Sequence, residues 1–282
     1  MNNTIPVSVI IMTKNEQRNI AKCLRSVSDF AEVFVVDSNS SDDTCKIAEA
    51  TGASVVNFTW NGKYPKKKQW CLENLPFSYD WVLYLDADEE LYPGLVDEIR
   101  ARLIPAPAET GFFVSYDYAF LGKTLKHGHR IYKLVLFNRH QGRFLDYDDL
   151  DVANMWEVEG HYQPKLAGKA GVLKNRMLHN DQDPLYHFIN KLNKYSDWEA
   201  ALRIKGTLRH GEQAALSPLR LLMQRVGDRL PCRGAAMFCY SYILKLGILD
   251  GKAGLYYALV LAYYHSFINM KIFETRHRNS IL

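Results

Sequence analysis

Residues 81–90 read WVLYLDADEE, and this stretch decides how the chain folds. Its first half is a run of large apolar residues, which predicts a buried strand, because a strand covered on both faces loses the alternation of apolar and polar side chains. Asp86 and Asp88 follow directly and cannot both belong to a core. Carboxylates this close repel one another unless a cation lies beside them. The stretch therefore predicts a strand that ends at an acidic site, whose oxygens suit a Mg²⁺ or Mn²⁺ ion.

The flanking segments alternate between strand and helix patterns. Further strands are predicted at residues 7–12, 33–36 and 55–58, and helices at residues 16–28, 43–50, 65–75 and from Pro93 to just before Pro105. Alternation at this spacing favours an α/β protein with a doubly wound, mostly parallel, Rossmann-like sheet. Ligands of such sheets bind at the carboxyl ends of the strands, so we expect the functional residues directly after the strands.

The composition is that of an ordinary folded protein. The chain has 282 residues and a formal net charge of +4, which suits one large domain with an appendage. With so small a charge we expect no nucleic-acid partner. The five cysteines are scattered without zinc-ligand spacing, and the first residues lack the pattern of a signal peptide. We therefore expect reduced thiols and a cytosolic site.

Polar residues follow the first two predicted strands. Asp37 ends the second strand and precedes residues 38–44, which themselves suit a helix N-cap, so capping does not need Asp37. A carboxylate here can accept the N–H of a pyrimidine base, much as acidic residues at strand ends read ribose in nucleotide folds. After the first strand, Thr13, Asn15 and Glu16 are expected to contact the nucleotide, with Thr13 lining the base pocket. Alternatively, Asn15 caps the next helix and Glu16 favours its positive end.

Lysines gather between the third strand and the next helix. Residues 60–70 contain Lys63, Lys66, Lys67 and Lys68. Beside a diphosphate they would neutralise phosphate charge, and the alternative is that they are ordinary surface lysines. No Gly-x-Gly-x-x-Gly follows the first strand and no P-loop is present, which argues against a dinucleotide-binding dehydrogenase and a P-loop protein.

In this order, the motifs resemble family 2 glycosyltransferases of the GT-A fold. The chain reads Thr-Lys-Asn-Glu from Thr13, Asp-Ser-x-Ser-x-Asp-x-Thr from Asp37, Trp-x-Gly from Trp60 and Asp-Ala-Asp-Glu from Asp86. It looks most like the branch of bacterial lipopolysaccharide-core and exopolysaccharide β-glycosyltransferases. The resemblance covers residues 5–105 and continues more loosely through residues 177–179, 194–196 and 249–255.

The resemblance implies roles for individual residues. It implies that Asp37 contacts the base, that Asp86 and Ala87 lie near the ribose or donor sugar, and that Asp88 holds the metal. It also makes His179 a further metal or diphosphate contact, although a lone histidine after apolar residues is as often simply packed. Similar proteins carry Gln-Arg-Asn where this chain has consecutive lysines, which leaves open which side chain meets the diphosphate.

An inverting transfer also needs a carboxylate that takes the proton of the acceptor hydroxyl. The resemblance places this base in residues 155–161, with a shifted spacing, and the stretch offers Glu157 and Glu159. We favour Glu159, which directly precedes Gly160, and keep Glu157 as the alternative. Weaker alternatives are Asp146, Asp148, Asp149 and Asp151.

The C-terminal part is rich in apolar residues with interspersed cations. Residues 219–230, which include Arg220, Arg225 and Arg229, and residues 235–249 and 253–270 have this texture. The last run is near the lower length limit for a membrane span, and its tyrosines are spread along it instead of lying at its two ends. The pattern predicts helices that lie in the membrane interface. The alternative is a soluble helical appendage packed on the domain.

We therefore expect a transferase domain at residues 1–212, with a nucleotide-sugar half at 1–105 and an acceptor half at 106–212, followed by a membrane-associating helical region at 213–282. The expected reaction moves a sugar from a UDP-sugar to a lipid-linked glycan of lipopolysaccharide or exopolysaccharide biosynthesis. It would take place at an anionic membrane surface, on the cytoplasmic face of the inner membrane. Two alternatives are a nucleotidyltransferase, whose Gly-rich, Arg-containing loop is missing here, and a non-catalytic membrane-bound scaffold.

Overall fold

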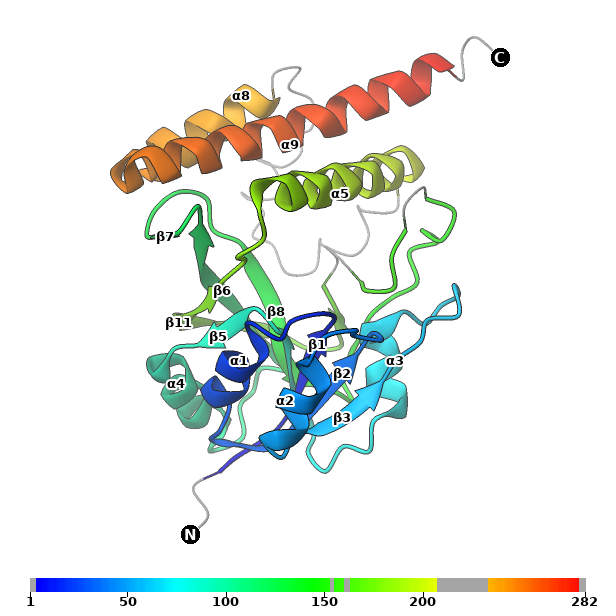
Figure 1. The fold of residues 1–282 in the computed structure, drawn as a ribbon, viewed down its shortest axis with the longest axis vertical. Helices are drawn as coiled ribbons and strands as arrows, with labels where there is room; N and C mark the ends of the chain where they lie inside the picture. The colour runs from blue at the N-terminus through cyan, green and yellow to red at the C-terminus, as the bar shows by residue number, and fades with distance from the viewer. Residues whose placement is uncertain (1–3, 153–154, 160–162, 207–232, 279–282) are drawn as a thin grey trace.

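A computed structural model describes residues 4–152, 155–159, 163–206 and 233–278. The first part of the chain forms parallel strands with helices on both faces (Figure 1). The strands are β1 (Ile5–Thr13), β2 (Phe30–Asp37), β3 (Ser54–Asn57) and β4 (Trp81–Asp86), in the spatial order β3-β2-β1-β4. Helices α1 (Ile20–Ser26), α2 (Thr44–Ala50) and α4 (Pro93–Leu103) cover one face, and α3 (Lys67–Asn74) covers the other. The strands and helices expected here are confirmed, although α1 is shorter than its pattern indicated.

The continuous apolar run of β1 is explained by burial on both faces. Val9 and Ile11 belong to the hydrophobic cluster under α1, α2 and α4. Ile10 and Met12, which alternate with them, belong to the cluster under α3. Successive side chains of a strand point to opposite faces, so a central strand covered by helices on both sides needs apolar residues throughout.

The second part of the chain extends the same sheet with mixed strand directions. It adds β5 (Glu89–Leu91), β6 (Gly111–Phe120), β7 (Lys123–Leu125), β8 (Tyr132–Asn138) and β11 (Ala170–His179). β8 pairs antiparallel with both β4 and β6, whereas β11 runs parallel to β6 and antiparallel to β5. The described residues thus form a nine-stranded mixed sheet, beside a small sheet of β9 (Gly142–Arg143) and β10 (Lys165–Leu166).

The expected α/β class is confirmed, but the expectation of a mostly parallel sheet holds only for β1 to β4. The reason is connectivity. A parallel partner needs a long crossover, usually a helix, whereas β6, β7 and β8 follow one another through short turns that favour antiparallel pairing. Strands from both expected halves, residues 1–105 and 106–212, belong to the same sheet, so the sheet joins the two halves into one layer. The proposed division of the chain stays a prediction.

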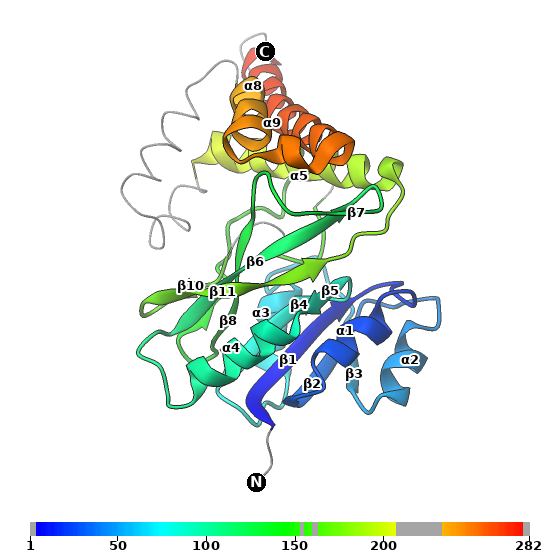
Figure 2. The ribbon, with the colours of Figure 1, turned by 90° about the vertical axis from the view of Figure 1, so that its left-hand side faces the viewer.

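Helices form a separate layer above the sheet, as Figure 2 shows. They are α5 (Leu185–Lys205), α8 (Arg233–Phe238), a π-helical turn η1 (Cys239–Leu244), a 3₁₀ turn η2 (Gly247–Asp250) and α9 (Gly251–Arg278). α9 packs on α5, with Tyr264 Oη donating to Glu199 Oε2 at 2.6 Å and Lys271 Nζ lying 2.6 Å from Asp197 Oδ1. One face of α9 is therefore packed on the protein, and its other face carries exposed apolar side chains.

The membrane prediction for this layer is not tested by the fold. Among the described residues, no helix combines the length and the apolar character that crossing a bilayer requires. The stretch at 219–230 with Arg220, Arg225 and Arg229 lies outside the described residues, and so does the boundary expected at residues 212 and 213.

Candidate active site

Residues that follow β1, β2, β4 and β11 surround one cleft of about 2010 Å³. Its lining includes Thr13 after β1, Ser38 after β2, Asp86 and Asp88 at the end of β4, and His179 at the end of β11. The carboxyl ends of the parallel strands thus open into the cleft, as expected for an α/β sheet. The cleft continues under the helical layer, where α5 and α9 contribute to its walls.

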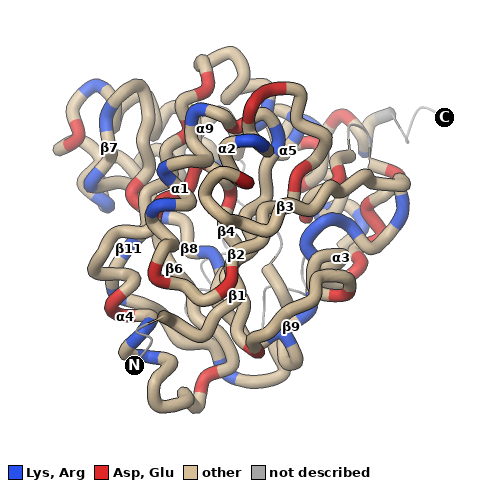
Figure 3. The backbone as a smooth tube through the Cα atoms, turned by 60° about the horizontal axis from the view of Figure 1, so that its bottom comes forward, with Lys and Arg blue, Asp and Glu red and all other residues tan. Residues whose placement is uncertain are grey.

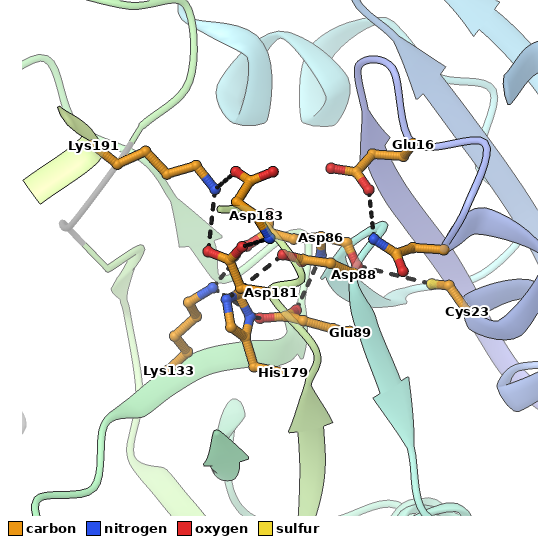
Figure 4. Close-up of polar contacts among 11 residues, drawn as sticks. Glu16, Cys23, Asp86, Asp88, Glu89, Lys133, His179, Asp181, Asp183 and Lys191 are labelled. Carbon is orange, nitrogen blue, oxygen red and sulfur yellow. Dashed lines mark hydrogen bonds and ion pairs between the residues drawn. The ribbon is translucent and has the colours of Figure 1, made fainter. Parts of the chain in front are cut away.

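One wall of the cleft is an acidic cluster with two basic partners (Figure 4). Lys133 Nζ lies 2.8 Å from Asp86 Oδ2 and 2.9 Å from Glu89 Oε1. His179 Nε2 lies 3.6 Å from Asp88 Oδ2, and its Nδ1 lies 3.4 Å from Glu89 Oε1. Each cation is therefore shared between carboxylates, which reduces the repulsion that the sequence alone implied.

The cluster shifts the pKa values of its members in different directions. Burial would raise the pKa of Asp86, but Lys133 and Lys68 outweigh this effect and hold it below its usual range. Burial and the neighbouring carboxylates raise the pKa of Asp88, although His179 opposes them. Burial would lower the pKa of His179, but Asp88 and Glu89 raise it to about 9. Negative charge thus exceeds what the cationic partners balance around Asp88.

Three of these side chains fit a divalent cation. Ligand atoms of Asp88, His179 and Asp181 all lie within 4.8 Å of one another, so that one ion could contact all three. Two carboxylates and one imidazole suit Mn²⁺ and, with more of its shell left to water and phosphate, Mg²⁺. Both metals stay open. The geometry is compatible with the expected ligation by Asp88 and His179, which stays a prediction.

Sequence reasoning missed three members of the cluster. Asp181 lies two residues beyond His179, and a histidine and an aspartate at this spacing after a strand indicate a possible metal site. Lys133 is the only cation in the otherwise apolar run of β8, which also marked it. Glu89 is the last residue of the Asp-Ala-Asp-Glu motif, and the sequence alone predicts no role for it. Its carboxylate also accepts the backbone N–H of Asp86 at 3.0 Å, so it shapes the turn after β4.

The start of α3 and the end of β1 also contribute residues to the cleft. Lys67 is buried and its Nζ donates to Ser38 Oγ at 2.6 Å, and Lys68 lines the same cleft. Burial lowers the pKa of both lysines. The hydroxyl of Thr13 is buried beside them and has no hydrogen-bond partner among the described residues, which leaves it available to a ligand. Glu16 lines the cleft too, and burial raises its pKa to about 7.

Two further residues predicted to contact the nucleotide, Asp37 and Asn15, do not line the cleft. Asp37 is buried, and its carboxylate accepts the N–H of Ser40 at 2.7 Å and its hydroxyl at 2.5 Å. Asn15 adopts a left-handed conformation, and its Oδ1 accepts the N–H of Ser41 at 2.8 Å. Both residues therefore support the loop after β2, and neither is among the cleft-lining residues. Because α1 begins at Ile20, the alternative that Asn15 caps it is wrong.

The lysine cluster divides into different environments. Lys63 is exposed and is not among the residues that line the cleft. Lys66 is buried, with Nζ 2.8 Å from Asp149 Oδ2, and the same oxygen accepts the indole N–H of Trp198 at 2.7 Å. Asp149 thus serves a buried ion pair that joins the start of α3 to α5. Only Lys67 and Lys68 remain close enough to the cleft to meet a diphosphate there.

Comparison with known proteins agrees with this geometry. The family model for glycosyl transferase family 2 matches residues 8–156, which is more than half of the chain. The chain belongs to this family. The expected resemblance is therefore confirmed at the level of the family.

Individual family 2 relatives match shorter parts. An uncharacterized glycosyltransferase of Rickettsia conorii is 48% identical over 98 residues, which are 34% of this chain and 34% of that protein. The matched segment thus spans about a third of that relative's length. The lipopolysaccharide core biosynthesis glycosyltransferase LpsC of Rhizobium meliloti is 29% identical over 147 residues, covering 50% of this chain and 53% of LpsC.

A solved structure resembles nearly the whole family 2 chain. The crystal structure of TarS from S. aureus aligns with a TM-score of 0.50 at 14% identity, covering 95% of this chain and 54% of TarS. At this identity the likeness concerns the fold alone. It supports the α/β architecture.

The two candidates for the catalytic base of a family 2 glycosyltransferase both line the cleft but differ in their hydrogen bonds. Glu159 is fully buried, and its two carboxylate oxygens accept the N–H groups of Lys68 at 2.6 Å and Gln69 at 3.0 Å. These are amides of the first turn of α3, which otherwise lack partners, so Glu159 caps that helix from a distant part of the chain. Glu157 lines the cleft, and its carboxylate accepts no hydrogen bond from the described residues.

Replacing Glu159 with alanine should lower the free energy of unfolding by about 1–3 kcal/mol. The substitution leaves two buried N–H groups at the start of α3 without acceptors. Urea denaturation followed by circular dichroism measures the change. The matched control is Glu157→Ala, which removes a carboxylate of the same kind that caps nothing. Equal stability of the two variants would show that the cap is unimportant.

Proposed function

We propose that this chain is an inverting, metal-dependent glycosyltransferase that moves a sugar from a UDP-sugar to an acceptor hydroxyl. One observation carries the proposal: a carboxylate cluster suited to a divalent cation and two lysines line the same cleft. A nucleoside diphosphate needs both, because its charge is balanced by cations placed on more than one side. The unpartnered hydroxyl of Thr13 adds a hydrogen-bonding group at the end of β1.

The chain's own residues divide the work of the reaction. Lys67 and Lys68 attract the diphosphate, while Asp88, His179 and Asp181 would hold the cation. The cation, when bound, neutralises charge that develops on the leaving diphosphate. Glu157 takes the proton of the acceptor hydroxyl as the oxygen of that hydroxyl attacks the anomeric carbon. The bond from that carbon to the diphosphate breaks on the opposite side, UDP leaves, and the configuration inverts.

The acceptor that we propose is a lipid-linked glycan of lipopolysaccharide or exopolysaccharide biosynthesis. The support is the similarity to LpsC, which extends over half of this chain. We place the reaction at the cytoplasmic face of the inner membrane, with the protein bound peripherally. The cleft continues under α5 and α9, so the layer expected to approach the membrane also borders the site.

A UDP-release assay tests the reaction and separates it from the two alternatives. The full chain is incubated with individual UDP-sugars and Mn²⁺ or Mg²⁺, with and without an extract of membrane lipids. We expect UDP release that depends on both the lipid extract and the metal. A nucleotidyltransferase would instead form pyrophosphate from UTP and a sugar phosphate, and a scaffold would release no UDP.

Replacing Asp37 with alanine should raise the KM for the UDP-sugar by about tenfold or more while kcat changes little. Asp37 holds the loop after β2 through Ser40, and a donor site that rests on this loop acts equally in the ground state and the transition state. Steady-state kinetics at varied donor concentration measure both constants. Because Asp37 also accepts hydrogen bonds from Ser40, Ser40→Ala is the control: it removes the hydroxyl contact but keeps the carboxylate. A normal KM with a collapsed kcat would contradict a role of Asp37 in donor binding.

A further inference from the structure

Two segments far apart in the sequence meet at one end of the helical layer, beside β7 (Figures 1 and 2). The first segment is residues 121–130, which join β6 to β8 and include β7. The second is residues 239–252, which run from η1 to the start of α9. Together these two segments are called the β7 tip. The buried carboxylate of Asp250 accepts the N–H of Lys126 at 3.0 Å and of His127 at 2.8 Å. Gly128 N donates to the carbonyl of Lys245 at 2.8 Å. The two segments therefore form one structural unit.

The β7 tip exposes large aliphatic side chains. Six of them have exposed fractions between 51% and 73%: Leu121, Ile243, Leu244, Leu246, Ile248 and Leu249. Single exposed apolar residues are normal on a protein surface, but a contiguous group marks a binding surface. Three of the six lie on η2 or at its boundary, which is pinned to the body by Asp250. The group is thus held outward by the fold.

The same tip is basic. It contains Lys123, Lys126, Arg130, Lys245 and Lys252, and within the two segments its one acidic residue is the buried Asp250. Arg130 and Lys126 lie 3.0 and 3.7 Å from the carboxylate of Asp117, outside the tip, whereas Lys245 and Lys252 are exposed. Figure 3 shows several Lys or Arg positions near β7, with acidic positions among them. Aliphatic side chains surrounded by cations complement an anionic phospholipid surface, with apolar chains beneath and phosphates at the same level as the lysines.

We propose that the β7 tip is the surface by which this protein docks on an anionic phospholipid bilayer. Exposed leucines and isoleucines of η1 and η2 enter the interface, and the lysines contact lipid phosphates. His129 belongs to the tip and also lines the cleft, so docking at the tip brings this part of the cleft close to the bilayer. The inference rests on the proposed function only in that a lipid-linked acceptor gives the docking its purpose. It differs from a flat contact along α9, because the tip presents its apolar group at one end of that helix.

Vesicle sedimentation tests the docking surface without relying on catalysis. The full chain is mixed with vesicles of phosphatidylglycerol and phosphatidylcholine, or of phosphatidylcholine alone, at low and high salt. We expect binding to the anionic vesicles that weakens with salt. The double variant Leu244→Glu/Leu249→Glu should weaken this binding by at least about tenfold, because two side chains that enter the bilayer interface on docking become charged. Lys245→Glu/Lys252→Glu should remove the preference for the anionic lipid.

The matched control is Tyr263→Glu/Met270→Glu, which changes two exposed side chains on the outer face of α9 outside the tip. It should bind vesicles like the wild type, and all variants should melt at the wild-type temperature. If the α9 variant loses binding and the tip variant keeps it, the protein lies along α9 and the proposal is wrong. If the wild type ignores vesicles but self-associates through Leu244, the surface is a dimer contact and the proposal is again wrong. Vesicle binding without any UDP release would instead contradict the proposed function alone.

Discussion

Replacing Asp88 with asparagine should lower the rate of sugar transfer by at least about a hundredfold while the protein stays folded. Asp88 offers one of the three ligand atoms that lie within 4.8 Å of one another. An amide oxygen lacks the charge that holds a hard cation, so the leaving diphosphate would lose most of its electrostatic stabilisation. The fold should survive, because the substitution removes one negative charge from a cluster that includes Asp86 and Glu89.

Two measurements check this result. UDP release is followed at saturating donor, and Mn²⁺ binding is followed directly by calorimetry, where the variant should bind at least about tenfold more weakly. The matched control is Asp183→Asn, since Asp183 pairs with Lys191 at 2.7 Å and lies outside the three-residue group. Treating the wild type with EDTA should abolish transfer, and Mn²⁺ or Mg²⁺ should restore it. Near-normal activity of Asp88→Asn, or full activity in EDTA, would falsify the metal assignment.

Replacing Glu157 with glutamine should lower kcat by about a hundredfold or more and leave the KM for the donor close to normal. The amide cannot take the proton of the acceptor hydroxyl, whereas the residues proposed to bind the donor, among them Lys67 and Lys68, are unchanged. Both glutamates line the cleft, and we prefer Glu157 because its carboxylate is not committed to a hydrogen bond among the described residues, whereas that of Glu159 accepts two. Its position is set by its own carbonyl, which accepts the N–H of Lys67 at 2.8 Å.

Glu159→Gln is the control that decides between the two residues. Glutamine keeps one acceptor oxygen for the start of α3, so this variant should lose stability but retain most of its kcat when folded. Activity is compared per folded molecule, with the folded fraction taken from thermal melting. If Glu159→Gln melts normally and is inactive while Glu157→Gln is active, the base is Glu159 and our choice is reversed.

Local patterns in the sequence were enough to locate the parallel strands β1 to β4 and the polar residues at their ends. The apolar run before Asp86 predicts β4, and β4 ends at Asp86. The lengths of β1 and β2 place Thr13 and Asp37 at the carboxyl edge of the same sheet. These features could be read because burial, strand period and the position of the first polar residue are all properties of neighbouring residues.

Other parts of the site depend on partners that are distant in sequence. Glu159 was favoured as the base from its place beside Gly160, yet its oxygens lie on amides of α3 some 91 and 90 residues away. Lys133 meets Asp86 only because β8 pairs antiparallel with β4, a choice that the pattern of β8 does not contain. Lys66 and Lys67 are consecutive, and only the fold sends one to Asp149 and the other toward Ser38.

The same distinction applies to the C-terminal helices. The sequence by itself determined that they are apolar with interspersed cations, and that their apolar content falls short of a clear membrane span. Only the tertiary structure decided that α9 covers α5 with one face and that Asp250 joins η2 to the turn after β7. The physical reason is that an amphipathic pattern shows how much apolar surface a helix must bury, but not against which partner. The partner follows from packing and hydrogen bonds between segments that are far apart in the sequence.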